Sequence, residues 1–213
     1  MPADGVDFLK TQAWTETAYA AVRDAASNKN LIIVIHNAFQ PLSSWLATSA
    51  TLNGVSTPLT SAHFAIDLHP YQNFDQLDLD IDQQAHIKKA CSWSANITAG
   101  TAGNLPVIIG EFSTATEICV YSDGHVTPGD TCDVAGCQCQ DNTNSNYWSQ
   151  RMIDAIRKYT EAQLDTFEKY AQAWFIWNYR AAGGWDLNVL VEKNVLPQPL
   201  DHREFPGQCG FTL

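Results

Sequence analysis

The chain has 213 residues, 45% of them hydrophobic, which is enough to bury the core of one domain. Twelve Lys and Arg against 23 Asp and Glu give a formal net charge of -11, which repels phosphate backbones and anionic lipids, so we expect no nucleic-acid partner. No stretch approaches membrane-spanning length, and the start of the chain lacks the basic flank and apolar run of a secretory signal.

Apolar runs typical of buried strands alternate with stretches in which apolar residues recur at helical spacing. Such alternation favours a parallel α/β sheet. In chain order we expect helices at about 6–27, 43–50, 81–93 and 147–170, and strands at 31–36, 63–68, 107–109 and 173–179.

Two polar segments are expected to be loops, the connection at 51–60 and a longer excursion at 114–146. The tail beyond Pro197 has little room for another strand and helix. A complete eight-stranded barrel takes about 250 residues, whereas only four strand-helix units are found here. The sequence therefore has the size and pattern of half a barrel.

Polar and aromatic residues follow each expected strand, at the end where parallel α/β folds hold their functional groups. Each also has a structural interpretation: a carboxylate that caps a loop, a histidine with its partner in the core, or an aromatic ring that fills the core. Recurrence at the same end of successive strands favours a site. The groups are His36 to Gln40, His69 with Tyr71 and Phe74, Glu111, and Trp177 with Tyr179.

All six cysteines lie beyond residue 90, and four of them fall between Cys119 and Cys139. This clustering is typical of disulfides in an oxidising compartment, although the sequence does not resolve the pairing. Cys137-Gln138-Cys139 lacks a second pair at zinc-like spacing, so no metal site is expected. Asn96-Ile97-Thr98 is an N-glycosylation acceptor, which agrees with an oxidising compartment.

Five segments resemble the exo-β-1,3-glucanases of glycoside hydrolase family five, which are (β/α)8-barrel enzymes common in fungal cell walls. Each segment is a weak signal alone, but the five are collinear and run from one end of the chain to the other. They are His36-Asn37-Ala38-Phe39-Gln40, His69-Pro70-Tyr71-Gln72-Asn73-Phe74, Gly110-Glu111-Phe112-Ser113, Tyr159 to Asp165, and Leu196-Pro197-Gln198-Pro199 through Phe211.

The resemblance implies one partial catalytic domain over 1–213, the C-terminal half (strands five to eight) of a TIM (β/α)8 barrel with a disulfide-stapled loop at 114–146. Glu111 resembles the family's nucleophile after strand seven. Retaining enzymes of this kind need two carboxyl groups about 5 Å apart. The second is expected in an Asn-Glu-Pro motif after strand four, and this sequence contains no such motif.

The resemblance also implies roles for the aromatic residues. His69 and Tyr71 resemble the pair that orders the nucleophile and contacts the glucosyl unit. Phe74 resembles a wall of the acceptor subsite, Phe39 is expected at the same mouth, and Trp177 resembles the platform under the non-reducing sugar. Three departures from the family pattern bear on fine specificity: Asn37 replaces an expected acid, Pro70 stiffens its loop, and Tyr179 replaces an expected Trp.

For the cysteines, the resemblance implies that Cys91 pairs with Cys209 and Cys119 with Cys139, which leaves Cys132 and Cys137 as an additional local staple.

The expected function is that of a retaining glycoside hydrolase that releases glucose from β-1,3-glucan in the full-length parent. Its partners are a β-glucan or oligosaccharide substrate and the missing N-terminal half-barrel, and the chemistry of carboxyl groups calls for no cofactor. The parent is expected to be secreted, extracellular or in the cell wall, with its signal outside this chain. Two alternatives stay open: an inactive truncated or remnant fragment that at most binds glucan, and another family-five β-glucanase or β-glucosidase.

Overall fold

A four-stranded parallel sheet lies at the centre of the computed structural model, which describes residues 7–52, 55–58 and 63–211. The strand order is β1-β4-β5-β9, and every neighbouring pair is parallel. The predicted parallel α/β architecture is therefore confirmed, and each strand overlaps an apolar run of the sequence. The strands are β1 (Ile33–His36), β4 (Phe64–Leu68), β5 (Val107–Phe112) and β9 (Ala173–Ile176).

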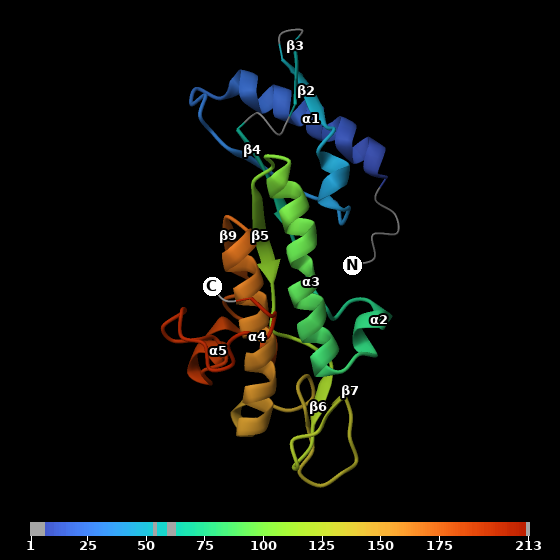
Figure 1. The fold of residues 1–213 in the computed structure, drawn as a ribbon, viewed down its shortest axis with the longest axis vertical. Coiled ribbons are helices and arrows are strands. Elements are labelled where there is room, and N and C mark those ends of the chain that lie inside the picture. Colours follow the sequence, from blue (N-terminus) through green and yellow to red (C-terminus); the bar gives the residue numbers. More distant parts are fainter. Residues whose placement is uncertain (1–6, 53–54, 59–62, 212–213) are drawn as a thin grey trace.

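Two long helices, α3 (Gln83–Ala102) and α4 (Gln150–Tyr170), run side by side along one face of this sheet (Figure 1). A side-chain oxygen caps the first turn of each, since Asp82 accepts from the Ala85 amide and Ser149 from the Met152 amide. The other α-helices are α1 (Phe8–Ala25), the short α2 (Gln76–Leu79) and α5 (Leu187–Glu192).

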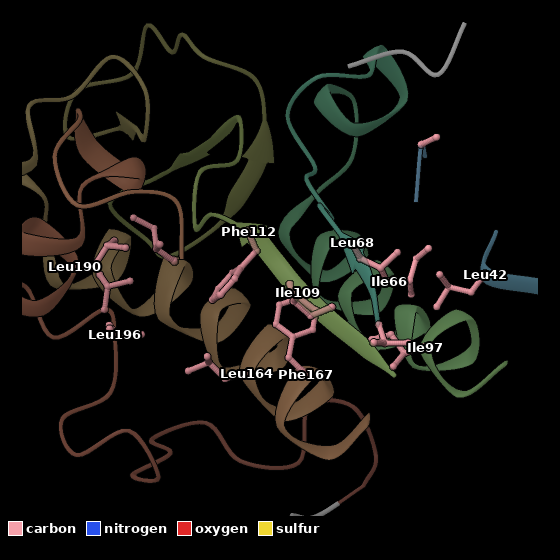
Figure 2. Packing of buried hydrophobic residues seen from close by; sticks show 14 of the residues in the cluster. Leu42, Ile66, Leu68, Ile97, Ile109, Phe112, Leu164, Phe167, Leu190 and Leu196 are labelled. Carbon is pink, nitrogen blue, oxygen red and sulfur yellow. The ribbon is translucent and has the colours of Figure 1, made fainter. Parts of the chain in front are cut away.

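The main core lies between the sheet and these helices. Ile66 and Leu68 of β4 and Ile109 and Phe112 of β5 point toward α3 and α4 (Figure 2). Phe167 of α4 meets the Phe112 ring edge-on, with ring centroids 5.1 Å apart. Alternate side chains of each strand therefore pack against the helices, and the side chains between them face the opposite side of the sheet.

The opposite face and both edges of the sheet are open. Val34 lies between two residues of β1 that pack on the core and is 48% exposed, and Phe175 of β9 is 59% exposed. Within the described residues, no further strand pairs with the outer edge of β1 or of β9. The sheet therefore presents apolar side chains and unpaired backbone groups at the same time.

Several local predictions were wrong. The expected helix at 43–50 is a 3-10 turn, η1 (Leu42–Trp45), followed by β2 (Ser49–Leu52), which pairs antiparallel with β3 (Val55–Pro58) where a loop was expected. The helix expected at 81–93 continues to Ala102. Residue 6, residues 53–54 and 59–62, and the start of the chain that lacks a signal pattern lie outside the described residues.

The excursion expected as a loop at 114–146 contains a three-stranded antiparallel sheet. It consists of β6 (Ile118–Val120), β7 (Val126–Pro128) and β8 (Gln138–Cys139), with β6 in the middle. Two short 3-10 turns, η3 (Ser145–Tyr147) and η4 (Gly183–Trp185), lie outside this sheet.

Three disulfides join Cys91 to Cys209, Cys119 to Cys139, and Cys132 to Cys137. These are the pairs that the resemblance implied. The first ties α3 to the C-terminal tail, and the second links β6 to β8. None of the described helices is both long and apolar enough to span a membrane.

Candidate active site

A β-bulge brings Glu111 to the open face of the sheet. Val107 and Ile109 are fully buried against the helices, so strict alternation would send residue 111 to the same side. The pairing of β5 with β9 instead shifts register between Ile109 and Phe112, and Phe112 takes the buried position. The extra residue thus re-aims the Glu111 side chain, as bulges beside functional sites often do.

Two groups from the loop after β4 meet one oxygen of Glu111. The Tyr71 hydroxyl donates to Glu111 Oε2 over 2.8 Å, and His69 Nδ1 lies 3.4 Å from the same atom. The carboxylate is partly exposed, as a group that reacts with a bound molecule must be. The sequence predicted these three residues as a set, and the structure brings them together.

Asp67 continues this network, and the sequence reasoning missed it. His69 Nε2 lies 2.9 Å from Asp67 Oδ2, while the Gly110 amide donates to Asp67 Oδ1 over 2.7 Å. A Cβ atom at Gly110 would collide with the Asp67 carboxylate, so only glycine fits beside it. An acid two residues before His69, inside an otherwise apolar run, was the available signal.

The charges of the site act on its histidines and tyrosine. Burial by itself lowers the pKa of His69, but the hydrogen bond that His69 donates to Asp67 and the charges of Asp67 and Glu111 outweigh it, so the pKa is raised. Burial, followed by the hydrogen bond to Glu111, raises the pKa of Tyr71, which therefore remains a donor. Burial and the neighbouring His69 lower the pKa of His36.

His36 and Phe39 form the β1 side of the site. The rings of His36 and His69 have centroids 4.4 Å apart, and Phe39 packs edge-on against His36 at 4.7 Å. His36 Nδ1 accepts from the Ala38 amide. Ala38 and Phe39 both have positive φ angles, 54° and 57°, which turn the chain sharply after β1. Phe39 is thereby joined to the Glu111 network through two histidine rings.

Phe74 belongs to an aromatic cluster whose third member, Trp185, the sequence reasoning missed. Ring centroids lie 5.2 Å apart for Tyr71 and Phe74, 5.5 Å for Tyr71 and Trp185, and 5.9 Å for Phe74 and Trp185. Trp185 lies in η4, far along the chain, so no local pattern signals the contact. Phe74 is 52% exposed and offers an apolar face beside the Glu111 network.

Trp177 follows β9 and is 47% exposed. Its backbone amide donates to the Phe112 carbonyl over 2.8 Å, which places it beside the residue after Glu111. Within the described residues, its ring makes no aromatic contact with the Tyr71, Phe74 and Trp185 cluster.

No second carboxylate within the described part of the chain is hydrogen-bonded to Glu111. Asp67 is the nearest acid in the network, and both of its oxygens are already engaged by His69 and the Gly110 amide. Within this network of described residues, Glu111 is thus the one carboxylate with an unengaged oxygen, whereas acid-assisted displacement needs two carboxyl groups.

Two other predicted positions lie away from this network. Asn96 lies within α3, where its side-chain oxygen accepts from the Leu42 amide, and its glycosylation stays a prediction. The sulfur atoms of Cys119, Cys132 and Cys139 gather within 4.8 Å of one another. All three belong to disulfides, so they are not the thiolates that bind metals.

A family model described as Cellulase (glycosyl hydrolase family 5) matches residues 7–183. Glucan 1,3-beta-glucosidase of Candida oleophila is 32% identical over 217 residues, which cover 97% of this chain and 48% of that protein. Glucan 1,3-beta-glucosidase I/II of Saccharomyces cerevisiae is 35% identical over 223 residues, which cover 98% of this chain and 47% of that protein. The chain thus spans about half the length of the curated relatives it matches.

Two solved structures share the fold. AoRut superposes with a TM-score of 0.57 and 18% sequence identity over 92% of this chain and 45% of that chain. The rutinosidase from Aspergillus niger gives a TM-score of 0.54 with 12% identity over 86% of this chain and 43% of that chain.

Proposed function

Since this chain belongs to glycosyl hydrolase family 5, the cellulase family, we propose that it forms part of a retaining glycoside hydrolase that releases glucose from β-1,3-glucan. The relatives named glucan 1,3-beta-glucosidase support this substrate class. The observation that carries the proposal is the convergence of the Tyr71 hydroxyl and His69 Nδ1 on Glu111 Oε2.

In the proposed mechanism Glu111 is the nucleophile. Tyr71 and His69 hold Oε2, while Oε1 has no hydrogen-bond partner among the described residues and attacks the anomeric carbon. The new carbon–oxygen bond forms as the glycosidic bond breaks, and the departing oxygen takes a proton from a second carboxyl group. Water then releases the sugar from Glu111, and the configuration at the anomeric carbon is retained.

The aromatic residues bind the sugar in this proposal. Trp177 is the platform for the glucosyl unit that is released, and Phe74 walls the acceptor side. Phe39 closes the β1 side of the mouth through its contact with His36. His69 and Tyr71 orient Glu111 and contact the same glucosyl unit.

The chain contributes strands five to eight of a TIM barrel in this proposal, and the other half supplies the proton donor. Three observations support the division: the match to about half of each relative, the two open sheet edges of the described residues, and the absence of Asn-Glu-Pro from the sequence. Because a missing general acid typically costs about a hundredfold to ten-thousandfold in rate, the isolated chain is inactive or nearly so. Secretion into an extracellular or cell-wall compartment is supported by the three disulfides.

One observation favours a second candidate function, a fragment that binds glucan without cleaving it. Phe74 and Trp177 are both about half exposed, whereas no second carboxylate among the described residues joins the hydrogen bonds around Glu111. Aromatic faces of this kind stack on sugar rings without any need for a nucleophile.

The decisive experiment compares laminarin hydrolysis by the 213-residue chain, by the chain joined to an N-terminal half-barrel of a relative, and by the Glu111→Gln variant of the joined protein. We expect activity only in the joined protein and a loss of at least about a thousandfold in kcat for Glu111→Gln, because the nucleophile is removed. Glu192→Gln, at an exposed glutamate of α5, is the matched control and should retain full activity. Hydrolysis that survives Glu111→Gln would refute the assignment.

A further inference from the structure

Two disulfides of the excursion at 114–146 lie in contact with each other. Cys139 Sγ, which is bonded to Cys119, lies 3.5 Å from Cys132 Sγ, which is bonded to Cys137. The sulfur atoms of Cys119, Cys132 and Cys139 all lie within 4.8 Å of one another, and Cys137 does not belong to this group of described residues. Thiol–disulfide exchange requires an attacking sulfur to reach a disulfide sulfur, and Cys132 is the cysteine of the outer bridge that is placed to do so.

The two bridges differ in their access to solvent. Cys119 and Cys139 are 0% and 3% exposed, so a thiol in solution does not reach the sulfur atoms of this inner bridge. Cys132 and Cys137 are half-buried, and the residues between them, 133–136, are exposed. A dissolved thiol therefore meets the outer bridge first, since the reactivity of a disulfide depends on access.

The exchange of one bridge for the other needs little movement of the backbone. Once Cys132 is released from Cys137, its side chain can rotate while its sulfur is already beside Cys139. A Cys132–Cys139 bridge joins residues 7 apart in the sequence, whereas Cys119–Cys139 joins residues 20 apart. The entropy of loop closure depends only weakly on loop length, so the two pairings are expected to be similar in free energy.

The inner bridge anchors a segment that holds other parts of the fold. Gln140 directly follows Cys139 and is buried, and its Oε1 accepts from the amide and the hydroxyl of Thr116. Its Nε2 donates to the Thr114 carbonyl, and the Thr114 hydroxyl donates to the Gly184 carbonyl in η4 over 2.8 Å. Release of Cys139 from β6 is therefore expected to loosen both β8 and the turn η4.

We propose that these four cysteines form a thiol–disulfide relay that unties β8 from β6 under reducing conditions. A dithiol in solution reduces the outer bridge and is oxidised to its own disulfide, which leaves Cys132 and Cys137 as thiols. The Cys132 thiolate then attacks Cys139 Sγ. The Cys132–Cys139 bond forms as the Cys119–Cys139 bond breaks, and Cys119 leaves as a thiolate that takes up a proton. The relay does not depend on the proposed glucan-hydrolase function.

The test compares two single variants of the 213-residue chain, Cys137→Ser and Cys132→Ser, without any reductant. Each lacks the outer bridge and carries one free thiol, but only Cys137→Ser keeps the thiol beside Cys139. The variants are held at about pH 8.5, where a free cysteine is about half ionised, then acid-quenched, alkylated and mapped by peptide mass spectrometry. We expect a Cys132–Cys139 bridge with a free Cys119 in at least about one tenth of the Cys137→Ser molecules, and free Cys119 in at least about tenfold fewer molecules of Cys132→Ser.

The parent chain supplies a second measurement that needs no substitution. During slow reduction by dilute dithiothreitol, the free Cys137 thiol should appear first, followed by free Cys119 in molecules that contain Cys132–Cys139. Equal amounts of free Cys119 in the two variants would show general scrambling and would overturn the relay, as would its absence from both. Reduction of the inner bridge in parent molecules whose outer bridge is intact would also overturn it. None of these outcomes bears on the hydrolysis of laminarin.

Discussion

The proposed role of Glu111 as nucleophile depends on one extra residue in β5, which turns its side chain away from the core. The residues on either side of the bulge, Ile109 and Phe112, are fully buried, so a one-residue change of register would bury the carboxylate against α3 and α4. The orientation of Glu111 therefore depends on backbone pairing as much as on its own hydrogen bonds.

Two buried side chains, Gln72 and His86, hold the loop that carries Tyr71 and Phe74. Gln72 donates through Nε2 to the His86 carbonyl over 3.2 Å, and its Oε1 lies 2.8 Å from His86 Nδ1. Both side chains are buried, and no partner of His86 Nε2 is found among the described residues. A proton on Nε2 would therefore place an unpaired charge in the interior.

This pair makes the stability of the chain depend on pH. Burial, followed by the nearby Lys89, lowers the pKa of His86 to about 4. The unfolded chain binds this proton near pH 6.5, so the free energy of unfolding should fall as the pH drops from about 6.5 toward 4. We expect a loss of about 2 to 3 kcal/mol in the parent between pH 7 and pH 4.5, measured by urea denaturation.

The His86→Gln variant removes the titrating group, so its unfolding free energy should lose about 2 to 3 kcal/mol less than that of the parent over the same pH interval. His125→Gln, at an exposed histidine, is the control and should behave as the parent does. Equal pH dependence in the parent and in His86→Gln would contradict the prediction.

At the scale of elements, the disulfides differ in the length of chain that they close and in the segments that they join. Cys91–Cys209 spans 118 residues and joins α3 to the tail, whereas Cys132–Cys137 spans 5 residues inside the excursion. A longer closed loop restricts the unfolded chain more, so its bridge stabilises the folded state more.

We therefore expect Cys91→Ala/Cys209→Ala to lower the free energy of unfolding by about 3 kcal/mol more than Cys132→Ala/Cys137→Ala does. Chemical denaturation of both double variants, with the remaining bridges intact, measures the difference. Similar losses for the two variants would show that local packing, and not chain restriction, sets the contribution of these bridges.

At the scale of the whole molecule, the uncovered face and edges of the sheet are expected to control association between chains. Val34 and Phe175 are exposed on the face opposite the helices, and the outer edges of β1 and β9 have no partner strand within the described residues. Exposed apolar side chains beside free strand edges promote association between chains. The isolated chain should therefore self-associate unless another half-barrel covers this face.

We expect sedimentation velocity of the isolated chain to show concentration-dependent association, and Val34→Lys/Phe175→Lys to shift the distribution toward monomer, because the charges oppose strand pairing and apolar contact. Leu77→Lys/Leu200→Lys places the same charges at exposed apolar residues outside the sheet, in α2 and in the C-terminal tail, and should leave the association unchanged. An equal effect of both pairs would mean that net charge alone controls association.

Local patterns in the sequence were sufficient to predict the strands of the central sheet. Buried strands such as Ile33–His36 and Val107–Phe112 are marked by continuous aliphatic runs, and α4 by its apolar stripe. The hairpin of β2 and β3 was missed although Asn53-Gly54, a common hairpin signal, lies between the strands in the sequence. The excursion was read as a loop because its strands are only two or three residues long.

By itself, the sequence determined the parallel α/β class and the places of the four strands along the chain, because these follow from short-range periodicity. The grouping of Glu111 with His69 and Tyr71 came from the resemblance of short motifs to those of a known family. Only the tertiary structure decided that a bulge aims Glu111 outward, that Asp67 anchors His69, and that Trp185 packs beside Phe74. Those features depend on strand register and on contacts between residues distant in the chain, which are set when the whole core packs.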